Sequence, residues 1–286
     1  MTFHNSALAW LVPDGNYLAD DLARVEAALS AHQTLTFVRL PSGLYSASSA
    51  GESIAATGYA SVWVRDNIYV AFAHHATGAG HIATEVVGAL IGFFTRYCHR
   101  FDDIISGAVD PQDVANRPHV RFDGRTLSEI GDQRWADAQN DALGYFLWLS
   151  STLAASGALK PDANAVSVLT HFVRYLAAIR FWQDEDSGHW EEQRKVSASS
   201  IGTVVAGLEA FADLLRQRDA ILPGECAQLV GSKNRRYDAA LLFLLFPLGV
   251  ITDDPVADLV LHDVSKLSRG SRETGLSFQS LARADH

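Results

Sequence analysis

The segment that decides the fold class is residues 197–217, which read SASSIGTVVAGLEAFADLLRQ. Apolar side chains recur in it at the i, i+3, i+4 and i+7 spacing, which places them on one face of an α-helix. These positions are Ile201, Val204, Val205, Leu208, Phe211 and Leu215. The run ends before Arg216 and Arg218. The segment is therefore predicted to be an amphipathic helix whose apolar face packs against a core.

Helical spacing also dominates the chain outward from this segment. Apolar residues within 143–153 and 166–176 follow the same template, and Gly157 stands where a helix over 137–156 would end. We expect nine helices, at about 17–32, 66–76, 81–104, 137–156, 162–182, 197–217, 224–234, 237–247 and 254–268. Residues 36–40 alternate like a strand, but one short run makes no sheet. With no linker in view, the prediction is one all-α domain over residues 1–268, followed by a disordered or atypical tail over 269–286.

Composition and charge narrow the class of protein. The 286 residues are 48% hydrophobic and 20% charged, which allows a large packed core, and the net charge is −10. An acidic chain without a stripe of Lys or Arg is not typical of a nucleic-acid binder. Two cysteines, Cys98 and Cys226, make no disulfide framework, and residues 1–16 lack the pattern of a signal peptide. The longest apolar stretch, 241–250, is too short to cross a bilayer. We expect a cytoplasmic protein that binds neither nucleic acid nor membrane.

Aromatic and charged residues gather at every second helix junction. They fall at 63–67, 135–141 and 189–192. In antiparallel helical hairpins every second junction lies at the same end of the molecule, so these three segments should meet on one rim. Carboxylates and arginines bond hydroxyl groups, and indole rings cover the apolar face of a sugar. The rim is therefore expected to bind a sugar.

Two of these segments each allow two readings. Glu191 and Glu192 follow Trp190, and a carboxyl group beside an indole in a partly dry pocket would keep its proton as a general acid. The alternative is an ordinary solvated acidic loop. Arg65 could form an ion pair that orients Asp66 toward ligand hydroxyls, or Asp66 could cap the following helix.

Two cofactor patterns are present but weak. Residues 78–83 read GAGHIA, which fits a dinucleotide-binding fingerprint, yet no second strand follows at the required distance. A helix–turn–helix with Gly78 after the first helix is the simpler interpretation. His81 and Glu85 lie one helical turn apart, but no further ligand pattern accompanies them. We expect no cofactor and no metal site.

Five motifs, taken in order, resemble one protein family. They are PSGLYSAS (41–48), WVRDN (63–67), GDQRW running into QNDA (131–142), GHWEE (188–192) and SASSIG (197–202). The series resembles the family 15 glycoside hydrolases, the glucoamylase-like proteins. It is still more similar to the glucoamylase-like domains of phosphorylase kinase regulatory subunits. The resemblance covers roughly residues 10–268 and implies an (α/α)6 toroid of six helical hairpins, with the site at one end.

The resemblance also implies a reaction, the hydrolysis of α-glucosidic bonds with inversion. This mechanism needs one protonated carboxyl group on the leaving oxygen and one carboxylate that activates water. By position, Glu191 matches the general acid, and Trp190 and Glu192 match residues that line the sugar. The implied partner is an α-glucan or an α-glucoside.

The remaining matched positions contact the sugar in the family. Arg65 and Asp66 match groups that clamp hydroxyls of the terminal glucose. Trp135 matches a platform tryptophan, with Asp141 nearby.

The chain departs from the family pattern toward its C-terminus. The toroid has twelve helices where we expect nine, and the family's general base lies between the last two. We therefore expect an incomplete toroid, truncated at the C-terminus, whose exposed apolar faces favour self-association. Hydrolytic activity is doubtful on this reading, and Glu273 is not assigned as the base. The alternative function is a non-catalytic carbohydrate-binding regulatory domain.

Overall fold

The computed structural model describes residues 18–32, 37–48, 59–131, 138–191, 193–217, 240 and 242–252, with residues 255, 257, 258 and 260–262. The chain divides into two compact units, residues 1–39 and 40–286. In the first unit, α1 (Ala19–Ala31) has no buried residue. Its first turn is closed by the Asp21 carboxylate, which accepts from the Leu18 N–H at 3.1 Å.

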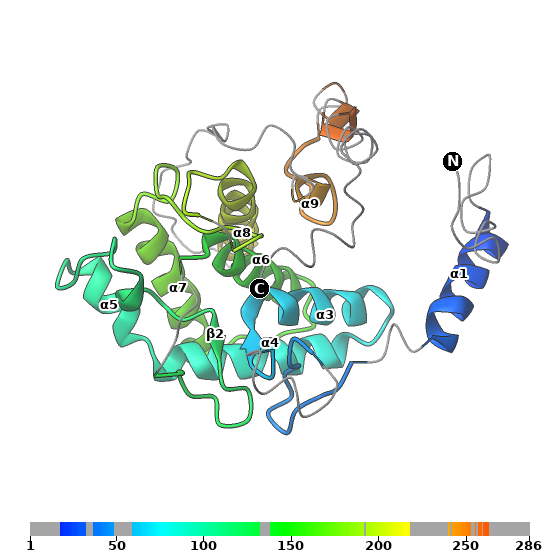
Figure 1. Cartoon of the computed structure of the whole chain (residues 1–286), viewed down its shortest axis with the longest axis horizontal. Helices are drawn as coiled ribbons and strands as arrows, with labels where there is room; N and C mark the ends of the chain where they lie inside the picture. The colour runs from blue at the N-terminus through cyan, green and yellow to red at the C-terminus, as the bar shows by residue number, and fades with distance from the viewer. Residues whose placement is uncertain are drawn as a thin grey trace. The chain divides into compact units, whose positions relative to one another are not determined.

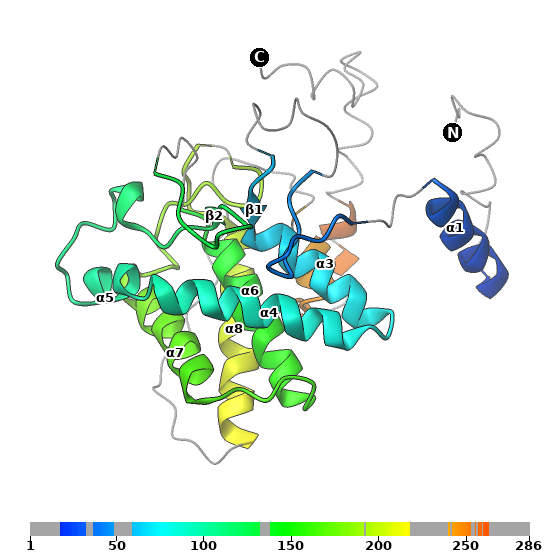
Figure 2. The same ribbon diagram turned by 90° about the horizontal axis from the view of Figure 1, so that it is seen from below.

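The second unit begins with a helical hairpin. Helices α3 (Val64–Ala76) and α4 (Gly80–Arg96) run antiparallel and side by side (Figures 1 and 2). Gly78 follows α3 with φ +89°, a backbone conformation that glycine adopts without strain. The predicted helix–turn–helix is therefore confirmed. The predicted helix over 81–104 is instead two helices, because α4 ends at Arg96 and α5 (His99–Ile105) starts in a new direction (Figure 1).

Two strands of two residues each pair at the start of α3. Strand β1 (Val62–Trp63) pairs antiparallel with β2 (Arg121–Phe122), and the Val64 N–H donates to the Val120 carbonyl at 2.9 Å. A short 3-10 helix, η2 (Val114–Asn116), lies between α5 and β2. The strands fix the start of α3. They were not predicted, because two residues are too few to alternate.

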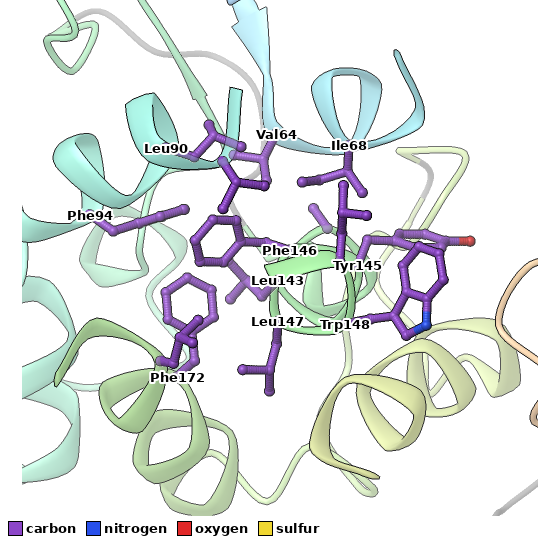
Figure 3. Close-up of a cluster of buried hydrophobic side chains, with 14 of the residues drawn as sticks. Val64, Ile68, Leu90, Phe94, Leu143, Tyr145, Phe146, Leu147, Trp148 and Phe172 are labelled. Atoms are coloured by element: carbon purple, nitrogen blue, oxygen red, sulfur yellow. The ribbon is translucent and has the colours of Figure 1, made fainter. Parts of the chain in front are cut away.

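Helix α6 (Asn140–Ala155) lies at the centre of the core. Fourteen of its residues are buried, so it has no solvent face. Figure 3 shows it end-on, with side chains from α3 and α4 on one side and Phe172 of α7 (Ala163–Ala178) on another. Phe146 of α6 packs 4.9 Å from Phe172, measured between ring centroids. A helix that is buried on every face needs neighbours all round it, which explains its central place.

Helices α6 and α8 (Ala198–Gln217) touch through their backbones. A Cβ atom added to Gly144 would lie 2.7 Å from the Thr203 carbonyl carbon, and one added to Gly207 would lie 2.7 Å from the Gly144 carbonyl oxygen. Two glycines thus permit the close approach. Within α8, Ala198–Arg216 is long and apolar enough to cross a membrane, and 56% of that window is buried. A core helix of this kind passes the same test, and here the helix packs against α6.

The predicted C-terminal helices are described only in part. The helix expected over 237–247 appears as the single turn α9 (Leu242–Leu245), whose Leu244 packs over Gly202 of α8. Part of the helix expected over 254–268 is present, since the described residues among 255–262 are helical. The helix expected over 224–234, the tail from 269 and Glu273 lie outside the described residues. Residues 37–40 do not form a strand.

Candidate functional site

Arg65 lies at the centre of a buried polar cluster. It is the second residue of α3, placed there by β1, and it is only 5% exposed. Its Nη1 donates to Asp141 Oδ2 at 2.8 Å, and its Nη2 donates to Glu191 Oε1 at 3.1 Å. Burial lowers the pKa of Arg65, but the charges of Asp141 and Glu191 outweigh it and hold the pKa above its ordinary value. The guanidinium therefore bridges two carboxylates as a fixed cation.

The N-terminus of α6 supplies the inner wall of the cluster. Asp141 stands in the first turn of the helix, where the helix dipole favours a negative charge. Asp141 is 1% exposed, so it contacts Arg65 from the interior of the protein. Gln139 accepts a second bond from Arg65 Nη1, at 3.2 Å. This wall holds the guanidinium in one orientation.

The outer wall is the turn that carries Glu191. The turn starts at Asp186, which forms an antiparallel β-bridge with Lys195. Gly188 has φ +62°, and Glu191 has φ +54°, a rare conformation for a residue with a side chain. The Gly188 carbonyl faces Arg65 Nη1 at 3.4 Å. The Glu191 side chain is 21% exposed, so its carboxylate touches both Arg65 and solvent.

Aromatic side chains stand beside this cluster and form what we call the aromatic wall: Tyr69, His189, Trp190 and Phe243. The Tyr69 hydroxyl lies 3.2 Å from His189 Nδ1, and its ring stacks on Phe243 with centroids 5.0 Å apart. His189 packs edge-on against Trp190 at 4.8 Å. Trp190 is 47% exposed, so the wall offers an indole to solvent next to Glu191.

A second buried ion pair, between Arg117 and Asp184, is connected to this cluster through the start of α6. Both nitrogens of the Arg117 fork bond Asp184, at 2.7 and 2.6 Å, and both side chains are fully buried. Asn140 at the start of α6 donates its Nδ2 to Asp184 at 2.9 Å and its backbone N–H to Asp186 at 3.0 Å. Burial, reinforced by the nearby charge of Asp141, raises the pKa of Asp186 to about 8. These bonds join the segment before Glu191 to the N-terminus of α6.

Four of the predicted site residues come together in the described part of the chain. They are Arg65, Asp141, Trp190 and Glu191. The residues near 65 and 190 therefore lie at the same end of the molecule, as expected. The third expected rim residue, Trp135, lies outside the described residues, and so does Glu192.

In the described structure Asp66 neither caps α3 nor pairs with Arg65, the two roles that the sequence suggested for it. Helix α3 begins at Val64, so Asp66 is the third helical residue and the capping position belongs to Trp63. Among the described residues Asp66 makes no ion pair with Arg65, because the Arg65 guanidinium is occupied by Asp141 and Glu191. Burial raises the pKa of the half-buried Asp66, and Arg65 opposes that shift.

Sequence reasoning missed several contributors to the site. Tyr69 follows Arg65 by four residues and so lies on the same helix face, a signal that was available. Gln139 lies in the QNDA motif, but its contact with Arg65 was not predicted. Phe243 comes from a distant segment, and nothing in its local sequence indicates its place. The assembled site offers a fixed cation, exposed carboxylate oxygen and an indole face, which suits a neutral ligand rich in hydroxyls. Within the described ranges, no group of three His, Cys, Asp or Glu side chains could hold a metal ion.

Comparisons with known proteins point to one family. The sequence profile of glycosyl hydrolases family 15 matches residues 26–233. The liver isoform of phosphorylase b kinase regulatory subunit alpha from Takifugu rubripes is 25% identical over 246 residues. That match covers 72% of this chain and 20% of the relative, so the chain spans about a fifth of that protein.

Solved structures show the same fold. A glycosidase with a glutamate-to-alanine substitution superposes with a TM-score of 0.67 at 23% identity, covering 88% of this chain and 72% of that one. A second such variant, in complex with glucose, gives 0.65 at 22% identity with the same coverage. A wild-type glycosidase gives 0.63, also at 22% and with the same coverage. The predicted all-α fold of the six-hairpin toroid is confirmed, and the chain corresponds to 72% of these structures.

Proposed function

Because this chain belongs to glycosyl hydrolases family 15, we propose that the Arg65 site binds the terminal glucosyl unit of an α-glucan or α-glucoside. The observation that carries the proposal is the position of Arg65. Its guanidinium forms one ion pair with the buried Asp141 and another with Glu191, whose side chain is partly exposed to solvent. A cation fixed in this way can donate to sugar hydroxyls without first being ordered.

The aromatic wall supports the same ligand class. The half-exposed Trp190 can cover the apolar face of a pyranose ring while Arg65 bonds its hydroxyls. Sugar hydroxyls then replace Glu191 as the outer partner of Arg65. Asp66 and the family-matched Trp135 and Glu192 complete the proposed binding set.

In the catalytic version of this proposal, Glu191 is the general acid of an inverting hydrolase. A general acid must carry a proton when it meets the leaving oxygen. Inversion also needs a carboxylate that activates water, about 6.5–9.5 Å from the acid. We do not assign Asp123 to this role, because its carboxylate accepts from the N–H groups of Arg125 and Thr126 and so closes its own turn.

A second function is favoured by one contact. The 3.1 Å ion pair between Arg65 and Glu191 engages the charged form of Glu191, which binds hydroxyls but cannot donate a proton to a leaving group. A non-catalytic carbohydrate-binding domain would keep this pair. The similarity to a protein named as a regulatory subunit points the same way.

Calorimetry with maltose or acarbose, run beside a glucose-release assay, tests both versions. We expect saturable binding, and very slow or no glucose release from this chain. Arg65→Ala should weaken binding by about 1.5–3 kcal/mol, as for a lost charged hydrogen bond. Arg65→Lys, which keeps the charge but loses the fork, should weaken it less. Arg96→Ala, at an exposed arginine on α4, is the matched control and should bind as the wild type does.

Glu191→Gln separates the two versions. If glucose release is measurable and this variant abolishes it, the hydrolase version holds. If the wild type binds without turnover and the variant still binds, the regulatory version holds. No saturable signal at tens of millimolar sugar would refute both.

A further inference from the structure

Asp186 connects the two walls of the site, although the proposed chemistry does not use it. Its Oδ2 accepts the backbone N–H of Asn140 at 3.0 Å, one residue before Asp141. Its backbone pairs with Lys195 in both directions, at 3.0 and 2.9 Å. The next residue, Ser187, donates its N–H and its hydroxyl to the Ala138 carbonyl, at 2.7 and 3.0 Å. Residues 186–191, here called the Glu191 turn, are thus attached to the start of α6.

The surroundings of Asp186 disfavour a charge on it. The residue is 1% exposed, and its Oδ1 has no hydrogen-bond partner among the described residues. Two other carboxylates, Asp141 and Asp184, add to the cost of ionising it. Burying an anion without a cation to offset it is expensive.

Few groups around Asp186 offset this cost. Arg117 is engaged by both oxygens of Asp184, and Arg194 lies 4.0 Å from the same carboxylate. The remaining titratable neighbour from α7, Tyr175, has its own pKa raised by burial, with Asp186 contributing. Ser200 of α8 approaches Asp186 closely enough to oppose the pKa shift, but not in the geometry of an ordinary hydrogen bond. Lys195 contributes its backbone to the bridge.

We propose that Asp186 is a positioning residue that stays protonated at neutral pH and holds the Glu191 turn against the N-terminus of α6. A neutral carboxyl group keeps Oδ2 as the acceptor for the Asn140 N–H and places a proton on Oδ1. The hydroxyl of Ser200, which lies close enough to influence the pKa of Asp186 and has no hydrogen-bond partner in the described structure, offers an acceptor for that proton. The value of this arrangement for sugar binding rests on the proposed function. The protonation and the attachment of the turn do not.

Thermal unfolding between pH 5 and 8 tests the protonation. The folded protein holds the Asp186 proton more tightly than the unfolded chain does, so this group makes stability fall as pH rises through that range. Asp186→Asn mimics the neutral carboxyl group, so the variant should not show this fall in stability as pH rises. The Tm advantage of Asp186→Asn over the wild type should therefore widen by about 5 °C or more from pH 5 to pH 8. A constant or narrowing difference would mean that Asp186 is ionised throughout, and would overturn the proposal.

Asp213→Asn is the matched control for that measurement. Its side chain is 63% exposed on α8, where solvent screens its charge. Its Tm difference from the wild type should stay nearly constant over the same pH range. A widening as large as that of Asp186→Asn would assign the effect to loss of any carboxylate and would count against the proposal.

Hydrogen–deuterium exchange tests the positioning. Asp186→Ala removes the acceptor for the Asn140 N–H and should speed exchange of amides in the Glu191 turn, while Asp186→Asn should restore wild-type protection. If Asp186→Ala does not fold, Asp186→Ser takes its place. Unchanged exchange in the folded Ala or Ser variant, or failure of Asn to restore protection, would overturn the proposal. Neither measurement uses a sugar. Failure of the sugar-binding test would therefore not change the outcome expected for Asp186.

Discussion

The contact between α6 and α8 makes a sharp prediction for Gly144→Ala. The added Cβ atom would lie 2.7 Å from two backbone atoms, the Thr203 carbonyl carbon and the Val204 nitrogen. Ordinary contact begins at 3.4 Å. The atoms that it meets belong to a helix backbone and cannot rotate away. The two helices must therefore separate along their whole crossing.

The size of the effect follows from two opposed terms. Overpacking a well-filled core costs about 1–3 kcal/mol, and a clash with backbone belongs at the upper end of that range. Alanine recovers up to about 1 kcal/mol of helix propensity. The expected result is a net loss of about 1–2 kcal/mol, which lowers the Tm by roughly 3–8 °C for a domain of this size.

Gly92→Ala is the matched control, because Gly92 is exposed in α4 and an added Cβ would meet nothing within 4 Å. It should raise stability by about 0.5–1 kcal/mol. Thermal unfolding followed by circular dichroism measures both variants. The reasoning is refuted if Gly144→Ala unfolds at or above the wild-type temperature while Gly92→Ala behaves as expected.

Two further predictions concern buried charge. Burial and the charge of Arg100 lower the pKa of His119 to about 4, so the folded state resists a proton that the unfolded chain accepts, and stability should fall by roughly 2–3 kcal/mol as pH drops from 6.5 to 4. His119→Gln should flatten this part of the stability curve in chemical denaturation, and an unchanged slope would contradict the assignment. Arg117→Met leaves the fully buried Asp184 without its cation and should cost about 3–5 kcal/mol. Adding Asp184→Asn should recover part of that loss, and a double variant as unstable as the single one would count against the ion pair as the cause.

Much of the fold could be predicted from local sequence. Helices α3, α6, α7 and α8 begin and end within a few residues of expectation, because apolar spacing and glycines after helices are local signals. The break between α4 and α5 could not be predicted. No glycine or proline marks it, and the chain turns there so that Phe101 can pack 4.8 Å from Phe172 of α7. That contact is between residues far apart in sequence.

The site was predictable only where its residues lie in motifs. The motifs predict Arg65, Asp141 and Glu191 as site residues, but the one ion-pair partner that the sequence suggests for Arg65 is Asp66, whose alternative role is to cap the helix. An adjacent residue cannot meet the guanidinium, because residues next to each other on a helix point in different directions. Asp141 and Glu191, 76 and 126 positions away, meet it instead. The domain limits at residue 268, the cytoplasmic location and the roles of the site residues stay predictions.

The left-handed backbone at Glu191 bears on how this protein changes under selection. A residue with a side chain at φ +54° costs about 1–2 kcal/mol relative to glycine. Variants chosen only for heat resistance should therefore accumulate glycine or asparagine at position 191. Variants chosen for capture of a sugar should retain glutamate there. The residue recovered at this one position would report which of the two pressures a population had experienced.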